Sequence, residues 1–359
     1  MQILAIDIGT GTQDILLFDT EREPENALKM VMPSPTQIVA EAIRRATAAG
    51  ADILLTDFTM GGGPCTWAVQ AHVKAGYRVY ATPSAACTFD DDLAAVTQMG
   101  VRIVSEDEVR HLRDVHRVGM RDVDLDAIRR VFETFGVSVE PAAVGVAVFD
   151  HGAAPPGYSD RRYRFEFLAE RLQAEPALTA LAFLSHEVPA RLTRMRAVAE
   201  QVHLNCPLLL MDTPAAAVLG ALEDPRVRQA RECIAVNIGN QHTLAFRLRN
   251  GRVTGLFEHH TGRLTVDRLD AWIEELAAGT IRNEDVYEDH GHGALLLEDR
   301  PMPLSFVSVT GPRRALLRGS RHQPYLAVPY GDMMLAGCWG LVRALAMRVP
   351  ALEGILSGR

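Results

Sequence analysis

Residues 2–18 of the chain read QILAIDIGTGTQDILLF. The apolar run at residues 3–6 is typical of a buried strand, and residues 15–18 (ILLF) form a second apolar run. The small residues between the two runs favour a turn. The segment therefore predicts two strands joined by a tight hairpin at the very start of the fold.

The hairpin turn is Gly9-Thr10-Gly11-Thr12. Its backbone N–H groups can approach phosphate oxygens closely, and its hydroxyls are further donors. Asp7, just before the turn, is placed to hold a hydrated magnesium ion. The alternative is a structural hairpin whose glycines only allow positive φ angles.

The same pattern returns at residues 233–243, which read CIAVNIGNQHT. Setting Asp7 opposite Asn237 also pairs Ala5 with Ala235, Ile8 with Ile238 and Gly9 with Gly239. The repeat predicts two pseudo-equivalent lobes whose turns face one cleft.

The composition fits two domains, since single cores stop growing near about 250 to 300 residues and this chain has 359. Its net charge of -8, with scattered basic residues, argues against nucleic acid as a partner. We interpret the cluster Arg161, Arg162 and Arg164 as a solvated or lobe-boundary stretch. Five dispersed cysteines indicate a reducing compartment, and the absence of a long apolar run indicates a cytoplasmic protein without a membrane partner.

The rest of the chain alternates helical and strand-like segments, so the fold class is α/β. The apolar run at residues 144–149 looks like the start of a new unit, which places a lobe boundary near residue 140. Another apolar run, residues 208–211, ends at Asp212 and is followed by a small-residue helix. A carboxylate thus stands at the end of a strand, where functional side chains are common.

The order of motifs resembles that of actin, DnaK-type chaperones, hexokinases and related sugar kinases. Five segments carry the resemblance: residues 7–12 as first phosphate loop, 212–217 as connecting segment, 237–243 as second phosphate loop, 308–312 as adenosine motif and 330–337 as closing connecting helix.

The resemblance implies two ribonuclease H-like lobes with a nucleotide cleft between them. The lobes would be residues 1–139, completed by a C-terminal helix at 333–359, and residues 140–332. The cofactors would be ATP and Mg²⁺, with Asp7 at the metal and Asp212 as the general base. A cap of the following helix is the other role open to Asp212. The nucleotide-binding residues would be Gly9, Thr10, Gly11, Thr12, Asn237, Gly239, Asn240, Gln241, His242, Thr310, Gly311 and Pro312.

Some residues depart from the family pattern. Many members carry an acidic residue where this chain has Asn237, and Asn240, Gln241 and His242 replace much of the usual glycine-rich run. Slow turnover, or recognition of something other than a plain β-phosphate, would follow. Pro312 removes a backbone donor from the adenosine motif.

The segment DFTMGGGP at residues 57–64 is not explained by the resemblance. Its backbone amides suggest an anion or substrate loop made of Asp57, Gly61, Gly62 and Gly63. A flexible structural turn is the alternative.

Two histidine groups invite a metal assignment. His259 and His260 point to opposite faces of a strand, so they cannot easily share an ion. His290 and His292 could share one in a loop, although we favour a solvated polar insertion.

The expected function is ATP-dependent phosphoryl transfer to a small-molecule acceptor. The alternatives are an ATPase that changes the conformation of a protein partner, and a nucleotide-binding regulator with little turnover. The chain also resembles a branch labelled as related to pyruvate formate-lyase activating enzyme. That label implies radical chemistry, and the sequence lacks the CxxxCxxC cluster motif that such chemistry needs.

Overall fold

The computed structural model describes residues 1–356 and contains three β-sheets. The first sheet has the strand order β3-β2-β1-β8-β10-β9. Its strands are β1 (Gln2–Ile8), β2 (Thr12–Asp19), β3 (Leu28–Pro33), β8 (Pro141–Val148), β9 (Ala182–Leu184) and β10 (Leu208–Asp212).

The second sheet has the order β14-β13-β12-β11-β15-β16. Its strands are β11 (Glu232–Ile238), β12 (His242–Arg249), β13 (Arg252–His260), β14 (Gly293–Leu296), β15 (Val307–Thr310) and β16 (Tyr325–Leu326). Asn250 and Gly251 form the hairpin turn between β12 and β13, both with positive φ angles.

The two sheets share one topology. In each, the first three strands form an antiparallel meander, and the next strand pairs in parallel with the first: β8 with β1, and β15 with β11. The edge strands β9 and β14 have no counterpart in the other sheet. When they are left out and the remaining strands are numbered along the chain, both sheets have the order 3-2-1-4-5. This is the duplicated ribonuclease H-like arrangement of actin-like ATPases, and it confirms the fold class that the sequence predicts.

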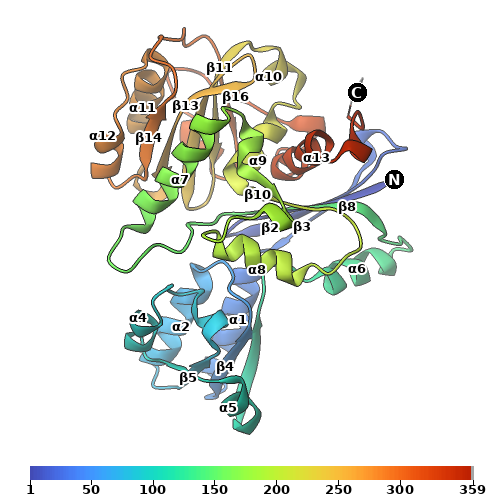
Figure 1. Ribbon diagram of the computed structural model, residues 1–359, viewed down its shortest axis with the longest axis vertical. Helices are drawn as coiled ribbons and strands as arrows, with labels where there is room; N and C mark the ends of the chain where they lie inside the picture. Colours follow the sequence, from blue (N-terminus) through green and yellow to red (C-terminus); the bar gives the residue numbers. More distant parts are fainter. Residues whose placement is uncertain (357–359) are drawn as a thin grey trace.

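A third sheet, not predicted as a separate unit, is inserted between β3 and β8. It is fully parallel, with the order β6-β5-β4-β7, and its strands are β4 (Asp52–Asp57), β5 (Val79–Ala81), β6 (Val101–Ile103) and β7 (Val115–Met120). Figure 1 shows this unit, coloured blue to cyan, below the rest of the molecule. It has a core of its own around Ile53, Leu55 and Val69.

The expected lobe boundary near residue 140 falls inside the first sheet. The strand β8 begins at Pro141 and pairs with β1, and β10 pairs with β8. The chain changes sheets between Asp212 and Glu232. The apolar run at residues 144–149 resembles the first strand of a lobe because any buried parallel strand is apolar on both faces. Its composition therefore does not show whether the strand begins a sheet or lies inside one.

Helices cover the sheets on both faces. They are α1 (Pro35–Ala48), α2 (Pro64–Lys74), α3 (Pro83–Ala86), α4 (Leu93–Gln98), α5 (Glu106–His111), α6 (Leu125–Thr134), α7 (Asp160–Ala174), α8 (Thr193–Gln201), α9 (Thr213–Ala221), α10 (Pro225–Gln229), α11 (Val266–Ala278), α12 (Asn283–Glu288) and α13 (Ala336–Arg348). Asp92 caps α4, since its side chain accepts a hydrogen bond from the Ala94 amide. In residues 1–356 no helix is long and apolar enough to cross a membrane.

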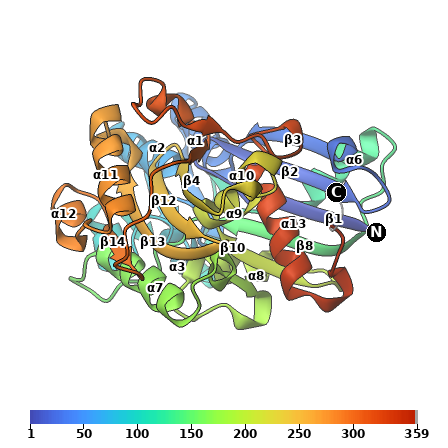
Figure 2. The ribbon, with the colours of Figure 1, turned by 90° about the horizontal axis from the view of Figure 1, so that it is seen from above.

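The helices α9 and α13 pack directly on each other at the centre of the molecule. Helix α9 follows β10 of the first sheet, and α13 follows β16 of the second. Helix α13 also contacts β1 and β8 of the first sheet (Figure 2). The crossing is so close that a Cβ atom at Gly340 would overlap the Ala216 carbonyl oxygen, and one at Gly220 would overlap that of Ala336. Glycine at both positions lets the two helix backbones touch.

We expect Gly340→Ala to lower the free energy of unfolding by about 3 kcal/mol, because the added methyl group must push the two helices apart. Urea unfolding followed by circular dichroism measures the change. Gly319→Ala is the matched control, since a Cβ there meets no atom within 4 Å. An unchanged midpoint for Gly340→Ala would contradict the tight crossing.

Candidate functional site

The two predicted phosphate hairpins face each other. The Gly9 amide donates to the Thr12 carbonyl over 2.9 Å, and the Gly239 amide donates to the His242 carbonyl over the same distance. A Cβ at Gly11 would lie 2.7 Å from the Asn240 side-chain nitrogen. The sequence repeat thus corresponds to a structural repeat, and the tips of the two turns are in contact.

A cavity of about 760 Å³ opens beside these turns. The cavity is lined by both hairpins, the glycine loop before α2, the acidic loop before α4 and the loop that follows β8. Of the residues proposed from the sequence, those on its wall are Gly9, Thr10, Gly61, Gly62, Gly63, Asn237, Gly239, Asn240, Gln241 and His242. The proposed residues outside its lining are Asp7, Gly11, Thr12, Asp57, Asp212, Thr310, Gly311 and Pro312.

The glycine loop of the inserted unit lies against the second hairpin. Gly63 has a φ of 73°, and a Cβ there would lie 2.9 Å from the Gln241 side-chain nitrogen. The Gly61 amide donates to Asp122 Oδ1 over 3.2 Å, so this amide already has an acceptor. Asp57 forms an ion pair with Arg121 outside the cavity lining. The loop therefore reaches the cavity through its glycines rather than through Asp57.

Asp7 and Asp14 form a buried acidic pair below the first hairpin. Burial raises the pKa of Asp7 well above its usual range, and the negative charge of Asp14 raises it further. Burial also raises the pKa of Asp14 to about 7. The Oδ1 atom of each is buried without a hydrogen-bond partner among residues 1–356. The Asp7 carboxylate also contacts the backbone of Gly337, at the start of α13.

Asp212, the proposed base, lies in a buried ion cluster. Its Oδ2 accepts from Arg164 Nη1 over 2.8 Å, and Arg164 Nε donates to both oxygens of Glu258 at 2.9 and 3.1 Å. Asp212 occupies the N-cap position of α9 without a side-chain cap hydrogen bond. Its Oδ1 is buried and has no hydrogen-bond partner within the described chain.

The expectation of a solvated arginine stretch is wrong for Arg164, which is 2% exposed. Burial alone would lower the pKa of its guanidinium, but the charges of Asp212 and Glu258 outweigh burial and raise it. Its guanidinium also lies 3.6 Å from the ring centroid of Phe149. The alternative, a position at the lobe boundary, agrees with the ion pairs of Arg164 to both sheets. Arg162 is exposed and Arg161 is partly buried, and single-sequence charge patterns do not separate such positions.

The predicted adenosine strand lies beside Asn237. β15 is parallel to β11, with Thr310 opposite Asn237. Gly311 has a φ of 97°, and a Cβ there would lie 2.8 Å from Asn237 Oδ1. The motif thus contacts the second hairpin although it does not line the cavity.

Sequence reasoning missed a second, partly buried arginine at the cavity. Arg194, on α8, makes two hydrogen bonds of 2.8 Å to the carboxylate of Asp122 and one of 2.7 Å to the Phe149 carbonyl. Asp150, in the loop after β8, accepts from the Gly152 and Met195 amides. These contacts fix the position of the loop that carries His151. No short sequence motif predicts them.

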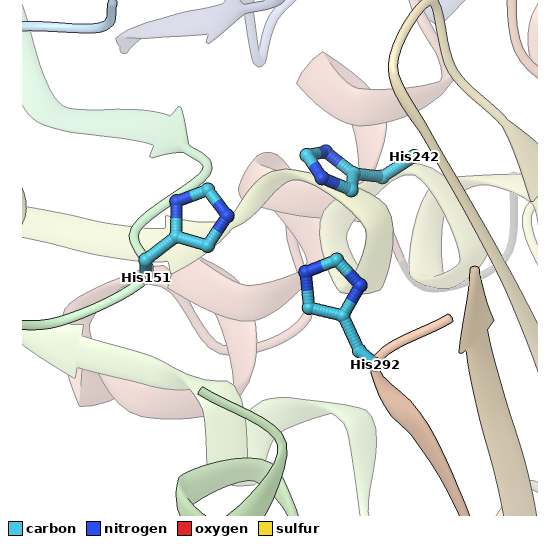
Figure 3. Close-up of side chains that lie close together, drawn as sticks. All are labelled: His151, His242 and His292. Atoms are coloured by element: carbon cyan, nitrogen blue, oxygen red, sulfur yellow. The ribbon is translucent and has the colours of Figure 1, made fainter. Parts of the chain in front are cut away.

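Three histidines gather at one side of the cavity: His151 from that loop, His242 from the start of β12, and His292 from the segment before β14. Figure 3 shows the three rings around a common space. His290, by contrast, is exposed, and His259 contacts the Asp289 carbonyl instead. The pairs His259 and His260, and His290 and His292, are therefore not the ones that the fold brings together.

The fold and the facing hairpins define a two-lobed protein of the actin-like class. More particularly, the chain belongs to the family described as "Putative pyruvate format-lyase activating enzyme (DUF1786)", whose model matches residues 60–316. A search of curated proteins found no match. The five cysteines do not fit an iron–sulfur cluster, because they are dispersed and none belongs to a group of three potential metal ligands in residues 1–356.

Several solved structures are similar along nearly their whole length. The inorganic polyphosphate/ATP-glucomannokinase from Arthrobacter sp. strain KM is 11% identical, with 97% of this chain and 99% of that chain covered and a TM-score of 0.38. The ROK hexokinase from Thermus thermophilus is 13% identical, with 97% and 100% covered and a TM-score of 0.30. The ethanolamine utilization protein EutJ from Carboxydothermus hydrogenoformans is 13% identical, with 96% and 89% covered and a TM-score of 0.32.

Proposed function

We propose that the chain binds ATP with Mg²⁺ in this cavity and transfers the γ-phosphoryl group to a small molecule. The observation that carries the proposal is the pair of hairpins, Gly9–Thr12 and residues 239–242, which meet at one wall of the cavity. Backbone amides of such turns are suited to phosphate oxygens, and two turns supply them from both lobes. Thr310, Gly311 and Pro312 would border the adenosine side.

Asp7 and Asp14 fit the expected magnesium ion. Both carboxylates are buried close together, and each keeps an oxygen without a hydrogen-bond partner in the described residues. A hard divalent cation prefers such oxygens and would offset the repulsion between the two charges. When bound, the ion supplies positive charge beside the phosphates. Asp7 would hold it, and the hairpin amides would orient the phosphate chain.

The acceptor would lie toward the inserted unit, beside the glycine loop. That wall of the cavity also carries Asp90, Asp91 and Asp92. Burial, followed by the charge of Asp160, raises the pKa of Asp91 to about 6. An acidic wall repels anions, so we infer that the acceptor is a neutral hydroxylated molecule or a cation.

Calorimetric titration with ATP, with and without Mg²⁺, tests the proposal. We expect binding that requires Mg²⁺, and we expect Asp7→Asn to weaken Mg²⁺-dependent binding at least about tenfold, or about 1.4 kcal/mol. Asp126→Asn, at an exposed site on α6, is the control and should bind like the natural chain. No binding of ATP or ADP would refute the nucleotide site, and unchanged binding in Asp7→Asn would remove Asp7 from it.

A second candidate function is a nucleotide-binding protein with slow hydrolysis, either a regulator or an ATPase that acts on a protein partner. The buried pairing of Asp212 with Arg164 favours it, because the Asp212 oxygen that accepts from Arg164 is not free to orient water or an acceptor hydroxyl. Comparing ATP hydrolysis with transfer to sugars and other polyols separates the candidates. Hydrolysis that no acceptor accelerates would support the second one.

A further inference from the structure

The histidine trio forms a compact ligand set from three distant parts of the chain. One side-chain nitrogen of each of His151, His242 and His292 lies within 4.8 Å of the others. The rings themselves are close, with centroids 5.0 Å apart for His242 and His292 and 5.6 Å apart for His151 and His242. In Figure 3 all three side chains project into the same space from different segments of the ribbon.

The ring nitrogens lack partners. His292 is 1% exposed, yet neither its Nδ1 nor its Nε2 has a hydrogen-bond partner within residues 1–356, and the same holds for Nε2 of His242. An unsatisfied buried polar group costs about 1 to 3 kcal/mol. Three such atoms in one cluster therefore point to a ligand that satisfies them.

The rings are suited to a metal rather than to an anion. The three rings share a space that is buried at His292 and partly buried at His151 and His242, and such a space disfavours a charged imidazolium because the charged form would lose its hydration. Neutral imidazole is the form that coordinates metal ions, whereas an anion would need imidazolium. Imidazole nitrogens suit zinc and neighbouring transition metals, while magnesium prefers oxygen.

We propose that His151, His242 and His292 bind one divalent transition-metal ion of the Zn²⁺ type, with an open coordination position toward the cavity. His151 and His242 both line the cavity wall, which is where the open position would lie. Three histidines with a fourth position for water or substrate are the ligand set of catalytic rather than structural zinc sites.

The required adjustment is small. Zinc–nitrogen bonds of about 2.0 to 2.1 Å in tetrahedral geometry place ligand nitrogens about 3.3 Å apart. The histidine nitrogens lie within 4.8 Å of one another, so rotations of the partly exposed His151 and His242 can close the difference. His242 stacks on Phe149, with centroids 4.0 Å apart and planes within 5°, which holds its ring beside the site.

The surrounding charges allow a cation. Arg164 lies close enough to lower the pKa of all three histidines, and it would repel a metal ion if it stood alone. The positive charge of Arg164 is balanced by Asp212 and Glu258, which both form ion pairs with it. Glu258 Oε1 also lies 4.0 Å from His292 Nε2, too far for a hydrogen bond but near enough to favour a cation at the ring.

This site goes beyond the proposed nucleotide function and gives the altered second hairpin a role. His242 stands at the end of the turn where the resemblance leads one to expect small residues. A metal with an open position there would accept a water molecule or an oxygen of a bound anion. The transition-metal site and the magnesium position at Asp7 would then be two separate cation sites.

The experiment is a calorimetric titration with Zn²⁺ of the full chain after removal of metals with a chelator, without nucleotide. We expect about one Zn²⁺ per chain, and we expect His151→Ala, His242→Ala and His292→Ala each to weaken binding by at least about 100-fold. His290→Ala, two residues from His292 but exposed, is the matched control and should bind normally. Circular dichroism verifies that each variant folds.

A second measurement does not depend on variants. Co²⁺ bound to the natural chain should give the intense visible absorption of four-coordinate cobalt, and Zn²⁺ should remove it. Absence of stoichiometric Zn²⁺ binding, or unchanged binding in His151→Ala and His242→Ala, would overturn the proposal. So would inorganic phosphate that binds through these histidines without metal. Zn²⁺ binding without ATP binding would instead overturn the nucleotide function and leave this site standing.

Discussion

Replacing Arg164 with methionine is expected to lower the free energy of unfolding by about 3 to 5 kcal/mol. Arg164 is the cation between two buried carboxylates, Asp212 and Glu258, which are 3% and 0% exposed. Methionine fills part of the volume but removes the charge, so two negative groups would remain in a site that water hardly reaches. Urea or guanidinium unfolding at pH 7 measures the loss.

Two further variants show whether the charge causes the loss. Arg196→Met changes an exposed arginine on the neighbouring helix α8 and should shift stability by less than about 0.5 kcal/mol. Combining Arg164→Met with Asp212→Asn and Glu258→Gln removes all three charges and should recover part of the lost stability. A cost below about 1 kcal/mol for Arg164→Met alone would show that the carboxylates do not depend on it.

The same cluster connects the two sheets. Asp212 ends β10 of the first sheet, Glu258 lies in β13 of the second, and Arg164 reaches both from α7. Together with the crossing of α9 and α13, it joins the two halves beside the cavity.

The hairpins were predictable because their signals are local. Residues 2–18 and 233–243 each contain a strand, a small-residue turn and a strand within one short window, so apolar periodicity and turn composition suffice. The repeat also predicted that the two turns face one cleft, and Gly11 and Asn240 lie close together there. The inserted sheet was not predicted as a unit, because strand pairing depends on contacts between distant residues.

The ion cluster and the histidine trio could not be predicted in the same way. Arg164 and Glu258 are 94 residues apart in the chain. His151, His242 and His292 come from three loops or strand ends, and no sequence pattern links the three. From the sequence, His290 and His292 were candidates for a shared ion, although a solvated polar insertion was favoured. The fold instead brings His292 together with His151 and His242.

Asp212→Asn is expected to lower the rate of ATP turnover about 10²- to 10⁴-fold while leaving nucleotide affinity within a few fold. The reason is that asparagine keeps the shape and can still accept a hydrogen bond from Arg164, but it cannot take a proton from water or an acceptor hydroxyl. The Oδ1 atom of Asp212, which has no partner in residues 1–356, is the atom that would do so. Phosphate release and calorimetry give the two quantities.

Asp224→Asn is the matched control, since Asp224 is also buried but caps α10 and accepts from Tyr325, outside the residues that line the cavity. It should lose stability without losing turnover, which separates a damaged fold from a missing base. If turnover survives in Asp212→Asn, Asp212 acts only as a partner of Arg164. The proton would then leave through solvent, and the slow nucleotide-binding function would become the better description of this cavity.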